Sequence, residues 1–150
     1  MKHIPVGVYL LCLLHTVLGV SAFAGGASLM IAPDGSLLNL KQDLLQHSPF
    51  GNYFMPGLLL FLLNGIFPFL IIFGLLFKPE WKIFDQFNFY KDKHGAWTYS
   101  LLSGIIVLIW IIMQQWMTTY FWLQPAIAAI GLLIIIITMM PGVMRYYTIR

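Results

Sequence analysis

The sequence predicts an all-α integral membrane protein, a four-helix bundle with a short amphipathic helix in its first extracytoplasmic loop. The chain is 60% hydrophobic and 9% charged, whereas soluble domains carry about 25% charged residues. It also contains four apolar runs, each long enough to cross a hydrocarbon core of roughly 30 Å. We therefore expect one transmembrane domain over residues 1–150.

The predicted spans are residues 6–31, 56–77, 97–116 and 124–140. Strands of a membrane β-barrel would be about ten residues long and would alternate in polarity, and these runs do neither. The first run contains Ala22-Phe23-Ala24, which resembles a signal-peptidase site, so cleavage is an alternative for this helix. The run continues to Ile31 and exceeds the 7–15 residues of a signal peptide's apolar region, which favours an uncleaved span.

Basic residues predict the orientation. With four spans, Lys2, the lysines of residues 78–93 and the arginines of residues 145–150 fall on one side, and only Lys41 falls on the other. Positive residues concentrate in cytoplasmic segments. Both termini are therefore predicted to be cytoplasmic.

Prolines predict where two of the spans are irregular. Pro68 lacks an N–H and leaves the carbonyl of Asn64 without its helical partner, so we expect a kink near the middle of the second span. The fourth span should stop at Pro141-Gly142, because proline cannot continue the helical hydrogen bonds and glycine readily caps a helix.

The loop after the first span predicts an outer amphipathic segment. Pro33-Asp34-Gly35-Ser36 is a turn signature, and Leu37, Leu40 and Leu44 follow at i, i+3 and i+7. One apolar face would result. This face is interpreted either as a lid over a small pocket or as an interfacial helix that only anchors the loop.

Three polar residues inside the predicted spans are the candidate ligand-binding residues. Counted from the span centres, His15, Asn64 and Ser103 fall in layers within roughly 8 Å of one another. Polar residues in spans usually face the interior and often mark function, so they are candidates to bind the polar head of a small apolar or amphipathic ligand. The alternative is that each makes an interhelical hydrogen bond worth about 0.6 kcal/mol.

Other function classes lack the residues that they need. All five carboxylates, Asp34, Asp43, Glu80, Asp85 and Asp92, lie in predicted loops, which argues against a proton-driven pump. A bis-histidine haem needs two histidines in one layer, but His3 would lie about 18 Å from His15. We expect no cofactor, no metal site, and no nucleic-acid partner, which would need a clustered basic stripe.

The expected partners are membrane lipids, with a small apolar ligand as a candidate. Gly19, Ala22 and Gly26 in the first span allow close helix approach, either within the bundle or against a second copy or another membrane protein. The leading function is a non-enzymatic binder of a small molecule, or an accessory to a membrane complex. The alternatives are a membrane enzyme acting on a lipid or quinone, with His15 as acid or base, and a small-solute transporter.

Several short motifs, taken in order, resemble a family of small, uncharacterised four-span bacterial membrane proteins. They are P-D-G-S-L-L at 33–38, S-P-F at 48–50, P-G-L-L-L-F and N-G-I-F-P within 56–68, H-G-A-W-T at 94–98, L-Q-P at 123–125 and R-Y-Y at 145–147. The resemblance implies the cytoplasmic (inner) membrane of a bacterium. It implies no activity and no catalytic residue.

Overall fold

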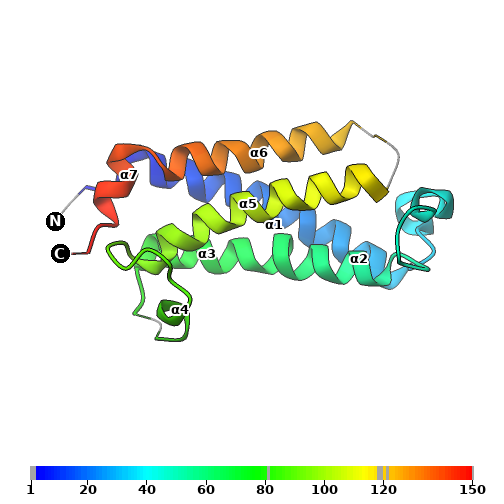
Figure 1. Cartoon of the computed structure of the whole chain (residues 1–150), viewed down its shortest axis with the longest axis horizontal. Helices are drawn as coiled ribbons and strands as arrows, with labels where there is room; N and C mark the ends of the chain where they lie inside the picture. The colour runs from blue at the N-terminus through cyan, green and yellow to red at the C-terminus, as the bar shows by residue number, and fades with distance from the viewer. Residues whose placement is uncertain (1–2, 81, 118–119, 121, 150) are drawn as a thin grey trace.

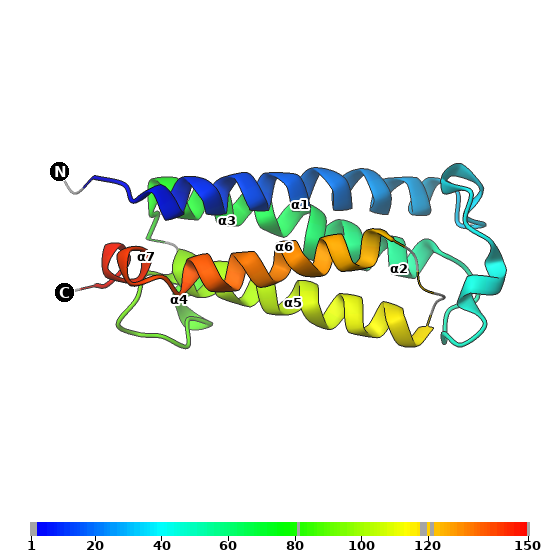
Figure 2. The same cartoon turned by 90° about the horizontal axis from the view of Figure 1, so that it is seen from above.

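Four long helical rods lie side by side in the structure, a computed structural model that describes residues 3–80, 82–117, 120 and 122–149 (Figures 1 and 2). The rods are α1 (Val6–Ile31), the continuous rod α2–η3–α3 (Phe54–Leu59, Leu60–Ile66 and Phe67–Phe77), α5 (Gly95–Met117) and α6 (Leu123–Thr138). The shorter elements are η1 (Ser36–Leu38), η2 (Gln42–Leu45), α4 (Lys82–Gln86) and α7 (Pro141–Tyr146). Every named element of the described chain is a helix, so the predicted all-α bundle is confirmed.

The rods alternate in direction. Both termini lie at one end of the bundle with α4 and α7, and the turns η1 and η2 lie at the other end (Figure 1). We refer to these as the terminal end and the η end. Consecutive rods are joined at alternating ends, which is the connectivity that the four apolar runs predict.

Three helices are long and apolar enough to cross a membrane: Val6–Ile31, Phe54–Phe77 and Gly95–Trp116, with mean hydropathies of 2.0, 2.5 and 2.0. α6 is apolar but only 16 residues long. Large apolar side chains, such as those of Leu13, Ile109 and Ile136, point away from the bundle and are more than half exposed. Apolar surface of this extent needs lipid or a partner to cover it.

The span boundaries agree closely with those predicted. α1 has the predicted bounds, the second rod begins two residues early at Phe54, and α5 extends the third span to Gly95–Met117. The fourth helix ends at Thr138, and Pro141 begins α7 as its first residue instead of stopping α6. Proline suits this position because the first N–H of a helix has no intrahelical partner.

The sequence predicts a kink at Pro68, and the structure shows a change of helical winding just before it. Residues Leu60–Ile66, just before the proline, form a π-helix, in which the N–H of Phe67 bonds to the carbonyl of Leu62. Pro68 has no N–H to donate to the carbonyl of Asn64. In the π-helical turn just before it, the Phe67 N–H bonds to the carbonyl five residues earlier, instead of the one four residues earlier. Asn64 lies inside this π segment.

The first loop contains two short 3₁₀ turns instead of one amphipathic α-helix. η1 and η2 are separated by Asn39, whose φ of 52° lies in the left-handed region. Such a residue ends a helix, and asparagine tolerates this conformation better than most residues. The i, i+3, i+7 pattern is therefore not on one continuous helix.

Glycines allow neighbouring rods to touch through their backbones. A Cβ added to Gly26 of α1 would lie 2.7 Å from the carbonyl oxygen of Gly57, and one added to Gly104 of α5 would lie 2.9 Å from that of Gly131 in α6. Gly19 likewise faces the carbonyl oxygen of Gly65. The small residues of α1 thus pack within the bundle.

The terminal end is closed by contacts between α7 and the end of α3. The Lys78 ammonium lies 3.4 Å from the ring centroid of Tyr146 and donates a 3.0 Å hydrogen bond to that residue's carbonyl. The Tyr147 hydroxyl donates to the Leu75 carbonyl at 2.6 Å. The tail after α6 is therefore fixed against the second rod.

Adjacent glycines in α1 provide a test of the backbone contact. We expect Gly26→Ala to lower the free energy of unfolding by about 1–3 kcal/mol, because the new methyl group meets backbone atoms that cannot move aside. Gly25→Ala meets only Leu60 Cδ2, at 3.7 Å, and should be neutral or stabilising, since alanine is the better helix former. Thermal unfolding in detergent, followed by circular dichroism, compares the two variants, and equal stabilities would contradict the contact.

Candidate functional site

The three polar residues predicted from the spans all lie inside the bundle. His15 of α1, Asn64 of η3 and Ser103 of α5 are 0%, 2% and 1% exposed. Four of their buried polar atoms have no hydrogen-bond partner: His15 Nδ1, Asn64 Oδ1, Asn64 Nδ2 and Ser103 Oγ. Each such atom costs about 1–3 kcal/mol when nothing satisfies it.

A hydrogen-bond chain connects His15 to two other helices. His15 Nε2 lies 3.1 Å from Ser100 Oγ, and Ser100 Oγ lies 2.9 Å from Thr138 Oγ1. These contacts join α1, α5 and α6 through side chains that are fully buried. The partner of His15 is therefore Ser100, which the sequence analysis did not single out.

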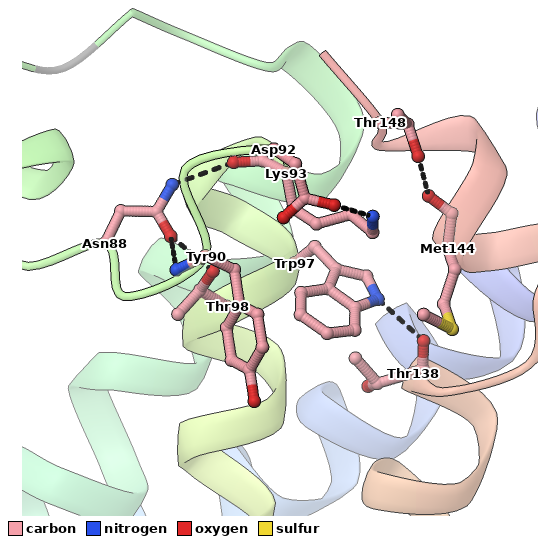
Figure 3. Close-up of polar contacts among 9 residues, drawn as sticks. All are labelled: Asn88, Tyr90, Asp92, Lys93, Trp97, Thr98, Thr138, Met144 and Thr148. Atoms are coloured by element: carbon pink, nitrogen blue, oxygen red, sulfur yellow. Dashed lines mark hydrogen bonds and ion pairs between the residues drawn. The ribbon is translucent and has the colours of Figure 1, made fainter.

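Thr138 also accepts a hydrogen bond through its backbone. Trp97 Nε1 donates to the Thr138 carbonyl at 2.7 Å, and one residue further Thr98 Oγ1 donates to Asn88 Oδ1 at 2.5 Å (Figure 3). Buried polar contacts thus continue from the interior of the bundle to the loop before α5. We call the whole series, from Asn88 and Thr98 through Thr138, Ser100 and His15 to Ser103 and Asn64, the polar column.

The members of the column lie at different depths. Ser103 is one helical turn beyond Ser100 on the same face of α5, roughly 4.5 Å further from the terminal end. Gly65, next to Asn64, packs between Gly19 and Phe23 of α1, which places Asn64 roughly 10 Å from the level of His15. The structure thus spreads the three residues along the bundle axis.

Gln124, in the first turn of α6, is another fully buried polar residue that the sequence analysis did not single out. The sequence did indicate that Ser100 lies on the same helix face as Ser103, because the two residues have i, i+3 spacing. Only the packed bundle shows which of the two serines meets His15.

The leucines predicted to form a lid do not act as one face. Leu37 is 56% exposed, whereas Leu40 and Leu44 are half-buried. The buried leucine of this loop is Leu45, which packs with Leu29 and Tyr53 at the η end. The loop is thus anchored to α1 and to the start of α2, and its apolar contacts close this end of the bundle.

The column contains imidazole, hydroxyl and amide groups. It can therefore donate hydrogen bonds to a polar group beside it and accept hydrogen bonds from that group. With His15 neutral, none of these side chains carries a formal charge. Among the described residues, no group of three or more His, Cys, Asp or Glu side chains is close enough to hold a metal ion.

The fold and these buried groups define the class of the protein: it is all-α, and three of its helices can cross a membrane. No protein-family model matches the chain, and no curated protein or solved structure is significantly similar to it.

Two buried serines on one face of α5 provide a matched test of the hydrogen-bond chain. Ser100→Ala removes the partner of His15 Nε2 and of Thr138 Oγ1, so we expect the free energy of unfolding to fall by about 1 kcal/mol. Ser103→Ala removes a hydroxyl without a partner and should cost nothing. Denaturant unfolding of both variants in the same detergent measures the difference, and a larger loss for Ser103→Ala would show that the chain is wrongly assigned.

Proposed function

We propose that the bundle binds a small amphipathic molecule whose elongated polar head, extending roughly 10 Å along the bundle axis, forms hydrogen bonds with His15, Ser103 and Asn64. The observation that supports this function is the set of four unpartnered polar atoms on these residues. Buried polar groups in native proteins almost always have partners, and the interior of a membrane bundle offers little water. A ligand head that satisfies these atoms would remove a cost of several kcal/mol.

The residues define the chemistry of that head. The Asn64 amide and the Ser103 hydroxyl can each donate and accept hydrogen bonds, and His15 Nδ1 is one more hydrogen-bonding atom. None of these groups is a carboxylate or an ammonium, so a neutral head with a hydroxyl, carbonyl or amide group fits better than a charged one. Apolar side chains of the same core, among them Leu11, Leu18 and Val107, would contact the apolar part of the ligand.

We further propose that this is a non-enzymatic binding protein, or an accessory subunit, of a bacterial inner membrane, with both termini in the cytoplasm. The lysines and arginines support this orientation, because Lys41 is the only lysine or arginine in the two connections at the η end and such residues concentrate on the cytoplasmic side. The motif resemblance described above supports the bacterial origin. α6 would be the fourth span, supported by its apolar sequence and its packing against α5 and α1.

A membrane enzyme acting on a lipid or quinone is the second candidate. It is favoured by the 3.1 Å contact between His15 Nε2 and Ser100 Oγ, because a hydroxyl within reach of an imidazole is the arrangement of a base and its nucleophile. In that case Ser100→Ala would abolish turnover and leave binding intact. Under the leading proposal the same variant changes stability alone.

Replacing the amide tests the binding proposal. We expect Asn64→Leu to lose a small molecule that the wild-type protein retains through purification from its native membrane, because the substitution keeps the side-chain volume and removes both hydrogen-bonding atoms. The variant should unfold at the same or a higher temperature, since it buries no unpartnered amide. Mass spectrometry of solvent extracts, normalised to protein, measures the retained molecule.

Ser21→Ala is the matched control for that experiment. Ser21 also lies in a span, but its side chain is exposed and its hydroxyl bonds to carbonyls of its own helix. The control should retain the wild-type amount. If extracts of wild type, Asn64→Leu and Ser21→Ala contain the same molecules in the same amounts, the interior does not bind a ligand.

A further inference from the structure

A groove lies along α3 and the start of α5 at the terminal end of the bundle, and none of its described lining residues belongs to the polar column. It contains about 380 Å³ of space, part of it open to the surroundings. Phe67, Leu70 and Ile71 line it on α3, and Tyr99 lines it on α5. From Phe67 to Gly74 the groove extends roughly 10 Å along α3, a depth that suits a hydrocarbon chain.

The charged and imidazole groups among the described lining residues lie at the mouth of the groove. Asp85 of α4 and His94, the residue before α5, line this part. A Cβ added to Gly95 would lie 3.6 Å from Asp85 Oδ1, so the carboxylate lies beside the first residue of α5. Among the described residues, no side chain forms an ion pair with this carboxylate. Lys93 pairs with Asp92 instead.

The mouth also offers hydrogen-bond donors. His94 Nδ1 accepts from the Ala96 N–H at 3.2 Å, so the neutral ring carries its proton on Nε2 and can donate from there. The Lys91 ammonium, which bonds to the Asp85 carbonyl at 3.0 Å, adds a positive charge close by. An acceptor for a cation and donors for an anion thus lie side by side.

Hydrogen bonds fix the segment before α5 that carries His94. Asn88 Nδ2 donates to the Lys93 carbonyl at 2.8 Å, and Asn88 Oδ1 accepts from the Tyr90 N–H and the Thr98 hydroxyl (Figure 3). The His94 N–H donates to the Tyr147 carbonyl at 2.8 Å. Groups on a segment fixed in this way lose less conformational freedom when they bind a ligand, which favours binding.

The mouth lies at the depth of lipid headgroups. The apolar rods end at Phe77 and begin again at Gly95, so Asp85 and His94 lie just outside the segments that would occupy the hydrocarbon core. The groove below them lies inside those segments. A molecule that fills both parts needs a polar head outside the core and an apolar chain within it.

We propose that this groove binds one phospholipid whose headgroup contains a primary ammonium, of the ethanolamine type. The ammonium donates hydrogen bonds to the Asp85 carboxylate, the phosphate accepts from His94 Nε2–H beside Lys91, and one acyl chain lies along Phe67 and Leu70. A choline headgroup has no N–H and cannot make the first contact. The site is therefore selective between two lipids with the same chains.

The test uses the purified full-length protein, stripped of lipid and offered an equimolar mixture of dioleoyl ethanolamine and dioleoyl choline phospholipids. Native mass spectrometry counts the lipids that remain bound. We expect the wild type to prefer the ethanolamine lipid about two- to fivefold, because Asp85 is exposed and an exposed ion pair contributes little to affinity. Asp85→Asn should reduce this preference to near unity.

A second variant tests the groove itself. At Gly95 a Cβ would make only ordinary contacts, the nearest being 3.5 Å from Tyr99, so we expect Gly95→Leu to fold, to fill the mouth and to lose the bound lipid of either kind. The controls are Asp43→Asn at the η end and Gly142→Leu in α7, where a Cβ would meet no atom within 4 Å. Both controls should behave as wild type.

Two results would overturn the proposal: equal retention of the two lipids by the wild type, or a preference that Asp85→Asn leaves unchanged. Retention of lipid by Gly95→Leu at the wild-type level would equally place the lipid elsewhere. None of these variants touches His15, Asn64 or Ser103, so this test can fail while the interior ligand is found, and the reverse also holds.

Discussion

Backbone contact at glycines decides how closely the helices of this bundle approach, and the buried polar interactions depend on that distance. Lipid is as apolar as a leucine side chain, so helices in a membrane gain little from burying apolar groups against one another and depend on close packing instead. Gly26 against Gly57 and Gly104 against Gly131 supply this packing in the two halves of the molecule. With α5 and α6 this close, the short side chain of Ser100 reaches Thr138 on α6, and the same hydroxyl lies 3.1 Å from His15 Nε2 on α1.

The apolar pattern was sufficient to predict the helical class and the bounds of the four long rods to within two residues, because a long run without charge has few alternatives to a buried or membrane helix. The loop was harder to predict. The i, i+3, i+7 leucines suggest a helix, yet Asn39 adopts a left-handed conformation and divides the segment into two turns. Similarly, Pro141 indicates a helix end, but whether a new helix begins there depends on contacts such as that between Val143 and Gly7.

For the candidate site, the sequence identified which polar residues are buried but not which of them meet. Polar residues in apolar runs tend to face the interior, and His15, Asn64 and Ser103 all do. Their partners depend on how each helix is rotated about its axis, and an error of one residue turns a side chain by about 100°. Ser100 and Ser103 differ by less than a full turn, so packing alone decides between them. The π segment around Asn64 adds an extra displacement that a regular helix would not have, and π segments frequently occur at functional sites.

The position of the His15 to Ser100 contact has a consequence for the order of assembly. α1 and the second rod form one antiparallel hairpin, and α5 and α6 form another, each joined by its own glycine contacts. Each hairpin is continuous in sequence and can enter the bilayer as a unit. The imidazole of His15 meets its hydroxyl partner only when the two hairpins dock. Until then His15 in the first hairpin lacks its Ser100 partner, and gaining that hydrogen bond favours the docked arrangement.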